Sequence, residues 1–138
     1  MEDGSSISRI LSKSAMKKTS IILILCQIID FAAYHLEAGE VNNRFIFGFY
    51  GNNWIAILTS MILLAAIVLW PTTRHMGTPV TLIFAGSLSN VLDRVIYGGV
   101  VDYMALWQVT HFNIADTLII AGLFVLLTRI AENKKLPV

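Results

Sequence analysis

The chain has few charged residues and almost no cysteine. Only 14% of its 138 residues are Asp, Glu, Lys or Arg, whereas a typical soluble domain has about 25%. The single cysteine, Cys26, excludes an intramolecular disulfide, and cysteine content therefore says nothing about the redox compartment. No internal repeat, nucleotide-binding glycine loop, HExxH motif or nucleic-acid-binding basic patch is present. We therefore expect no cofactor and no nucleic-acid partner.

Apolar residues dominate instead. They make up 56% of the sequence, and the mean hydropathy is +0.70. Four apolar stretches, at residues 19–36, 54–70, 78–97 and 114–130, are each close to the roughly 20 residues that a membrane helix needs. The first follows several lysines, as a secretory signal would, but Gln27 and Asp30 interrupt it and no small-residue cleavage site follows. We therefore predict a single-domain, all-α integral membrane protein with four transmembrane helices.

The positions of the basic residues predict the orientation. Eight of the ten Lys and Arg residues precede the first stretch, separate the second from the third, or follow the fourth: Arg9, Lys13, Lys17, Lys18, Arg74, Arg129, Lys134 and Lys135. The positive-inside rule then places both termini in the cytoplasm. We expect a polar, basic segment over residues 1–18, either a disordered tail or a short amphipathic helix, then a membrane domain over 19–131 and a cytoplasmic tail over 132–138.

Both outer segments have the character of β-structure. The first, EAGEVNNRFIFGFYGNN, mixes β-forming and aromatic residues before a Gly51-Asn52-Asn53 turn, and we expect a strand or hairpin over the outer mouth of the bundle. The second opens with Gly98-Gly99, a helix stop, and continues as the strand-like word VVDYM. Tyr103 and Trp107 suit an interfacial aromatic belt.

Two aspartates lie where the predicted topology brings them to the same outer face. Asp102 and Asp116 are set in the apolar words VVDY and FNIAD, and an ionised side chain at the bilayer centre costs about 2.5–3.5 kcal/mol. A carboxylate pair can divide acid and base work. Asp116 has an equal alternative role, because it lies at position N3 of a helix that Asn113 would cap. Asp102 has no such local role.

The third apolar stretch carries a polar face. Asn90, Asp93 and Arg94 are spaced i, i+3 and i+4, and they therefore share one side of a helix. They either form a structural cluster, with Asp93 touching Arg94 and Asn90 bridging helices, or they reach into a site and hold a substrate. Gly86 precedes them and permits a close helix crossing. Asp30 suits a helix–helix hydrogen bond.

The sequence gives less support to two other kinds of site. His111 with Asp102 and Asp116 could ligate a divalent metal, but no fixed ligand spacing supports this, and we expect no metal. A small ion- or solute-coupling subunit could use Asp30 with the polar face of the third stretch.

The segment AGSLSNVLDRVIYGGVVDYM, followed by FNIADTLI, resembles the C-terminal motifs of the lipoprotein signal peptidases, the signal peptidase II family. The motifs of that family are roughly GGxxGNxxDR, then VVDF, then FNxAD, in this order along the chain. In this chain the matching residues are Asn90, Asp93 and Arg94 for NxxDR, Asp102 for VVDF, and Asn113 and Asp116 for FNxAD.

The resemblance is strong over residues 86–118 and weaker before them. The family's DQxxK word appears as CQIID, with Asp30 and no following lysine, and Ser89 stands where glycine is usual. The NxGxAFG word appears as NNRFIFG, in which Asn42 takes the asparagine position while Arg44 and Phe45 replace small residues. These departures spare the aspartate pair and fall in regions expected to affect substrate recognition.

The resemblance implies an intramembrane aspartyl endopeptidase of the bacterial cytoplasmic membrane. It would remove the signal peptide from diacylglyceryl-modified prolipoproteins, immediately before the lipidated cysteine, with its site toward the extracytoplasmic face and the apolar outer loop as a flap. Asp102 and Asp116 would be the catalytic pair, one as general base and the other as general acid. The residues that bind substrate or support the pair would be Asn42, Asn90, Asp93, Arg94 and Asn113. We expect a monomer without cofactors that contacts substrate and membrane lipid. The alternative is a non-catalytic or substrate-altered lipoprotein-binding paralogue.

Overall fold

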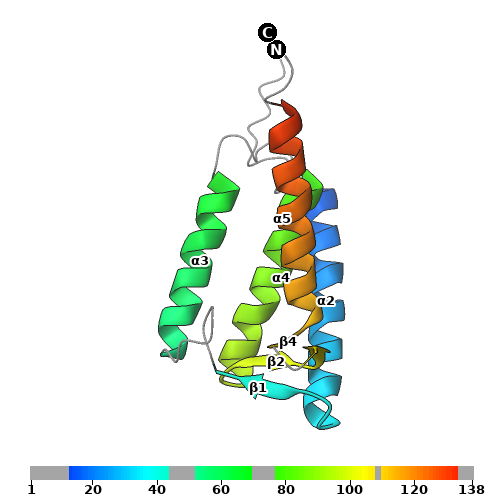
Figure 1. Cartoon of the computed structure of the whole chain (residues 1–138), viewed down its shortest axis with the longest axis vertical. Coiled ribbons are helices and arrows are strands. Elements are labelled where there is room, and N and C mark those ends of the chain that lie inside the picture. Colours follow the sequence, from blue (N-terminus) through cyan, green and yellow to red (C-terminus); the bar gives the residue numbers. More distant parts are fainter. Residues whose placement is uncertain (1–12, 44–51, 70–76, 108–109, 134–138) are drawn as a thin grey trace.

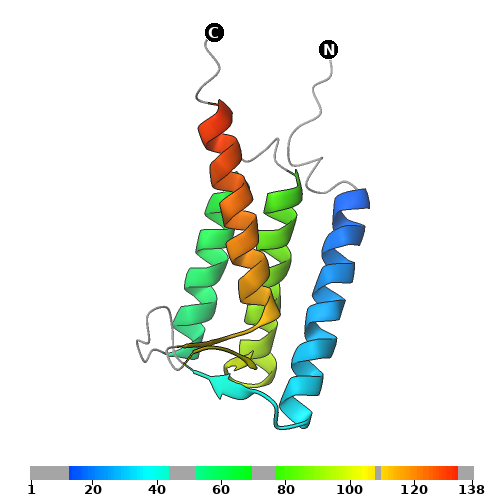
Figure 2. The same cartoon turned by 45° about the vertical axis from the view of Figure 1, so that its right-hand side comes forward.

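Four helices run side by side with short strands at one end (Figure 1). The computed structural model describes residues 13–43, 52–69, 77–107 and 110–133. Within these ranges the helices are α2 (Lys13–His35), α3 (Asn53–Leu69), α4 (Gly77–Ile96) and α5 (Ile114–Asn133). The start of α2 and the end of α5 both lie at the end opposite the strands, and the turned view in Figure 2 agrees.

Helix α4 is the centre of the bundle, because it contacts α2, α3 and α5. Its crossing with α5 is close. A β-carbon on Gly86 would lie 2.5 Å from the carbonyl oxygen of Ala115, and one on Gly122 would lie 2.7 Å from Cγ1 of Ile83. Small residues at such crossings let two helix backbones approach. Ile83 and Leu126 form the buried apolar contact between the two helices, at 1% and 5% exposure.

The outward faces of the helices are apolar. Ile24, Phe124 and Leu127 are 57%, 69% and 64% exposed, and extensive exposed apolar surface is the mark of an interaction with membrane or partner. Two helices among the described residues, Gly77–Ile96 and Ile114–Glu132, are long and apolar enough to cross a membrane, and α3 is apolar but shorter. The predicted helical stretches are therefore confirmed as helices, while the four-span topology stays a prediction.

The strands form two small antiparallel pairs. Their bounds are Glu40–Asn42 for β1, Val100–Asp102 for β2, Met104–Leu106 for β3 and Thr110–Phe112 for β4. β1 pairs with β2 and β3 pairs with β4. The small β-element predicted beside the helices is thus confirmed. The rest of the predicted outer-loop hairpin, residues 44–51, lies outside the described residues.

Substitution of Gly86 by alanine is expected to lower the stability of the bundle by about 1–3 kcal/mol. The added methyl group would meet a backbone carbonyl, which cannot move aside without shifting α5. The measurement is thermal unfolding of the purified protein in detergent. Gly77→Ala is the control, because a β-carbon there has no heavy atom within 4 Å. Equal melting temperatures for the two variants would contradict the close crossing.

Candidate active site

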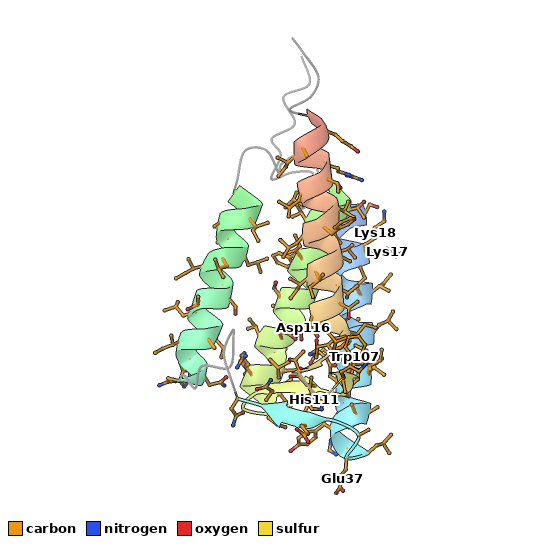
Figure 3. All side chains as sticks on the ribbon, viewed as in Figure 1. Lys17, Lys18, Glu37, Trp107, His111 and Asp116 are labelled. Atoms are coloured by element: carbon orange, nitrogen blue, oxygen red, sulfur yellow. The ribbon has the colours of Figure 1, made fainter. Side chains whose placement is uncertain are left out.

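A cavity of about 440 Å³ opens among α3, α4, α5 and the strands. Its apolar walls include Leu64, Ile67 and Leu123. Its polar lining consists of Asn42, Asn90, Arg94, Asp102, His111 and Asp116. Figure 3 shows His111 and Asp116 at the strand end of the molecule, with Lys17 and Lys18 at the other end. Both aspartates of the predicted pair therefore border one space.

Asp116 is held at the start of α5 by a reciprocal cap. The Asn113 side chain accepts the Asp116 amide proton (2.8 Å), and the Asp116 carboxylate accepts the Asn113 amide proton (3.3 Å). This is the arrangement of a capping box. Asn90 Nδ2 donates to Oδ1 of Asp116 at 2.7 Å, and Asn113 Nδ2 donates to Oδ1 of Asn90 at 3.0 Å. Asp116 thus caps the helix and also faces the cavity, so its two predicted roles are compatible.

Asp102 ends strand β2 and is only 4% exposed. Asn42 on β1 is paired with Val100, two residues away, and diagonal neighbours in a sheet share one face. Its Nδ2 accordingly donates to Oδ2 of Asp102 at 2.8 Å. Among the described residues, no donor reaches the other carboxylate oxygen, Oδ1. Asp102 is therefore fixed by one oxygen, and the second is left for another partner.

The surroundings of Asp102 favour its protonated form. Burial raises its pKa to about 6, against the stabilising hydrogen bond from Asn42. The charge of Asp116 raises the pKa further, whereas His111 and Arg94 lower it. Asp116 is therefore near enough for its charge to act on Asp102.

Asp93 supports the site from outside the cavity. It is fully buried, its Oδ1 accepts a hydrogen bond from Gln27 Nε2 (3.0 Å), and its Oδ2 accepts the amide proton of Val101 (3.2 Å). Because Val101 precedes Asp102, Asp93 fixes the strand that carries Asp102. These two hydrogen bonds give Asp93 a structural role, with Gln27 on α2 and Val101 on β2 as its partners.

Arg94 lines the cavity and joins the start of α3 to the end of α4. Its Nη1 donates to Oδ1 of Asn53 at 3.3 Å, and Asn53 Nδ2 donates to the Arg94 carbonyl at 2.7 Å. Asn53 is a residue that the sequence reading treated only as part of a turn.

Three more residues escaped the sequence reading of the site. Gln27 donates to Ser89 Oγ (3.0 Å) as well as to Asp93, and Ser89 Oγ donates to Asp30 at 3.3 Å. The predicted helix–helix hydrogen bond of Asp30 is thereby confirmed. Tyr103, predicted for an interfacial belt, instead uses its hydroxyl to accept the Ile114 amide proton (3.2 Å). The signals in the sequence were Gln27 and Asp30, which are polar breaks in an apolar run.

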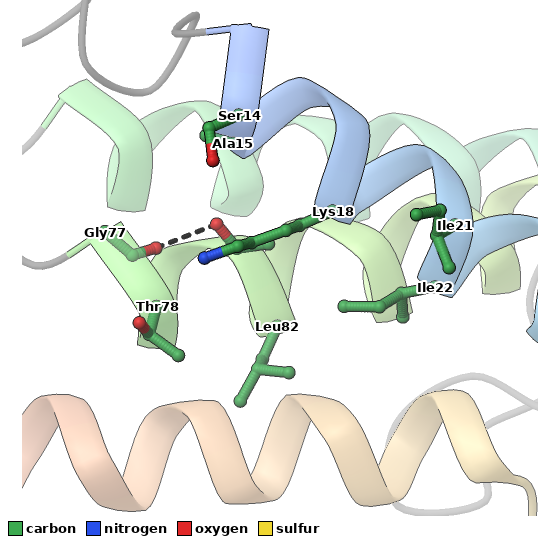
Figure 4. A pocket seen from close by; sticks show the side chains of 9 residues that line it. Ser14, Ala15, Lys18, Ile21, Ile22, Gly77, Thr78 and Leu82 are labelled. Carbon is green, nitrogen blue, oxygen red and sulfur yellow. Dashed lines mark hydrogen bonds between the residues drawn. The ribbon is translucent and has the colours of Figure 1, made fainter.

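A second groove, of about 380 Å³, lies between α2 and α4 at the end away from the strands (Figure 4). Lys18, Ile21 and Leu82 are among its lining residues, and its one drawn hydrogen bond runs from the Thr81 hydroxyl to the Gly77 carbonyl (2.8 Å). None of its lining residues is acidic. It is therefore separate from the cavity that contains the aspartates.

The chemistry available in the cavity is acid–base chemistry. No group of three or more His, Cys, Asp and Glu side chains in the described part of the chain is placed to hold a metal ion. Two coupled carboxyls on one cavity, one of them with an unused oxygen, can instead share the activation of water and the protonation of a leaving group.

Solved structures define the class of protein to which this fold belongs. A bacterial membrane enzyme determined by the in meso method at 2.3 Å superposes with a TM-score of 0.72, at 19% identity, over 90% of this chain and 91% of that one. A second such enzyme, determined at 1.9 Å, gives a TM-score of 0.66 at 20% identity, over 86% and 93%. The fold is that of a bacterial membrane enzyme.

Sequence similarity identifies the family. A family model described as signal peptidase (SPase) II matches residues 7–131. Curated lipoprotein signal peptidases from Methylobacterium radiotolerans and Syntrophomonas wolfei are 36% identical over 76 residues and 32% identical over 90 residues. These matches cover 50% and 62% of this chain, but only 44% and 60% of the relatives. The chain belongs to the signal peptidase II family.

Replacing Asp102 by asparagine is expected to stabilise the protein at neutral pH and not in acid. Because the pKa of Asp102 rises from 3.8 to about 6 on folding, the native state binds more protons between these values, and stability falls as pH rises through them. Asparagine still accepts the hydrogen bond from Asn42. Because it does not ionise, it removes this loss of folding stability, which amounts to about 3 kcal/mol above pH 7. Thermal unfolding in detergent from pH 4 to pH 8 measures it.

Glu132→Gln, at an exposed position in α5, controls for the loss of one negative charge. A constant difference between Asp102→Asn and wild type across this pH range would show that Asp102 is not buried as described.

Proposed function

We propose that this chain is an intramembrane aspartyl endopeptidase that removes the signal peptide from diacylglyceryl-modified prolipoproteins. Cleavage falls immediately before the lipid-modified cysteine. The observation that carries the proposal is the cavity shared by Asp102 and Asp116 in a chain of the signal peptidase II family. Curated relatives carry the name lipoprotein signal peptidase, which supports the same substrate class.

In the proposed reaction Asp116 is the general base and Asp102 the general acid. Asp116 accepts two N–H donors at a helix N-terminus, which suits a carboxylate, and burial keeps Asp102 protonated up to about pH 6. Asp116 takes a proton from water as its oxygen attacks the scissile carbonyl carbon, and Asp102 protonates the carbonyl oxygen. When the C–N bond breaks, the proton on Asp116 passes to the leaving nitrogen and Asp102 recovers its own.

The remaining residues of the site support this division of work. Asn42 orients Asp102, while Asn90 and Asn113 orient Asp116. Arg94 lines the cavity and is proposed to bind the substrate backbone or headgroup, with Asn42 beside it.

The apolar walls of the cavity suit the lipid part of the substrate. Leucine and isoleucine side chains from α3, α4 and α5 extend the cavity away from the carboxylates. A diacylglyceryl group transferred to such a surface gains about 0.8 kcal/mol for each CH₂ group that it buries. We propose that these walls receive the acyl chains while the peptide lies at the polar end.

The proposed setting is the bacterial cytoplasmic membrane, which all four helices cross, with both termini in the cytoplasm. Lys17 and Lys18 lie at the end opposite Asp116 and His111, which supports an extracytoplasmic site (Figure 3). The boundaries at residues 18 and 131, the flap and the monomeric state stay predictions.

The alternative of a non-catalytic, lipoprotein-binding paralogue is not favoured. Both aspartates and their asparagine partners are in place, and the relatives that match are curated as peptidases. The altered positions Arg44 and Phe45 lie outside the described residues.

Asp102→Asn and Asp116→Asn are each expected to reduce cleavage of a diacylglyceryl-modified precursor by at least about 10²-fold, because each removes one proton-transfer group. The measurement is release of signal peptide by purified protein in detergent micelles. Glu132→Gln makes the same carboxyl-to-amide change at the far end of α5 and should cut at the wild-type rate. Full activity in either aspartate variant would exclude the proposed pair.

The lipid group of the substrate is expected to be required. A precursor carrying diacylglyceryl-cysteine should be cut at least about 10-fold faster than the same unmodified precursor, because only the former can bury acyl chains in the cavity. The ratio of kcat/KM values for the two precursors is the measure. Equal values would remove prolipoproteins as the substrate class.

A further inference from the structure

Tyr103 joins the backbones that carry the two aspartates. It directly follows Asp102, and its hydroxyl oxygen accepts the amide proton of Ile114 at 3.2 Å. Ile114 is the first residue of α5 and lies two positions before Asp116. One side chain next to the first aspartate is therefore bonded to the backbone next to the second.

The hydroxyl of Tyr103 still has its own proton to donate, because its oxygen acts as acceptor for Ile114. Asp30 on α2 is near enough for its charge to act on the Tyr103 phenol. Asp30 is fully buried and receives a hydrogen bond from Ser89 Oγ at its Oδ2. Burial and, after it, the Asp30 charge raise the pKa of Tyr103, so this phenol stays a donor at all working pH values.

The same cluster reaches Asp102 from its other side. Ser89 Oγ accepts a hydrogen bond from Gln27 Nε2 (3.0 Å), which also donates to Asp93 (3.0 Å), and Asp93 holds the amide of Val101. Asp102 is therefore flanked in sequence by Val101, which is tied to this buried cluster, and by Tyr103, which is tied to the start of α5.

We propose that Tyr103, bonded to the Ile114 amide, is a positioning residue that sets how Asp102 and Asp116 face each other. The expected kinetic effects rest on the proposed peptidase function. The expected structural effects rest only on the hydrogen bond between Tyr103 and Ile114. The hydroxyl touches the backbone of α5 and not the substrate, so its effect is on how the two carboxyls face each other.

Tyr103→Phe removes only the hydroxyl and is expected to lower kcat for a lipid-modified precursor by about 10- to 100-fold, the cost of a misplaced catalytic group. KM should stay within about two-fold of wild type, because the walls of the cavity are unchanged. The pH–rate profile should change, since the repulsion between two carboxyls depends on their separation. Tyr34→Phe, at a residue that is 40% exposed, is the matched control and should leave all three quantities unchanged.

Amide hydrogen exchange in detergent tests the structure without any cleavage. In Tyr103→Phe the Ile114 amide should exchange faster, while the Thr117 amide, bonded to the Asn113 carbonyl at 3.3 Å, keeps its protection. Wild-type protein that fails to cut any lipidated precursor would reject the peptidase function and leave this exchange result standing. Unchanged Ile114 exchange, or Tyr103→Phe with wild-type kcat and pH profile, would overturn the positioning role.

Discussion

Carboxyl groups buried in an apolar bundle must find hydrogen-bond donors, and this requirement governs the strand end of the molecule. Asp30 and Asp93 are fully buried and Asp102 nearly so. Their donors come from α2, from α4, from β1 and from the backbone of β2. Apolar contacts among helices in lipid discriminate poorly between arrangements, because lipid tails are as apolar as leucine. The polar contacts are therefore what fix the strands against the helices.

Polar residues within about one turn of α4 make contacts with each of the other three helices and with β2. Asn90 meets Asp116 and Asn113 at the start of α5, Asp93 meets α2 and β2, and Arg94 meets α3. The close approach at Gly86, one turn earlier, sets the depth of the crossing that lets Asn90 reach α5. Any rotation of α4 would disturb all three contacts together, so the orientation of the aspartate pair depends on the rotation of this one helix.

Local patterns in the sequence predict the parts of this arrangement that are local. Apolar runs mark the helices, VVDYM marks β2 and part of β3, and the N-cap of α5 follows from FNIAD. Helix α2 begins at Lys13, before the apolar run, because lysine, alanine and methionine are good helix formers whether or not they lie in an apolar stretch. The partners of Asp93 could not be predicted, since Gln27 and Val101 come from segments that only tertiary packing brings to it.

Asp30 and Tyr103 are not among the residues that line the cavity, whereas Asp102 and Asp116 line it and are bonded to Asn42 and Asn90. Two neighbouring carboxyls are sensitive to their separation, because their mutual repulsion decides how one proton is shared. The hydrogen bond between Tyr103 and the Ile114 amide therefore bears on the interaction between the two carboxyls from outside the cavity.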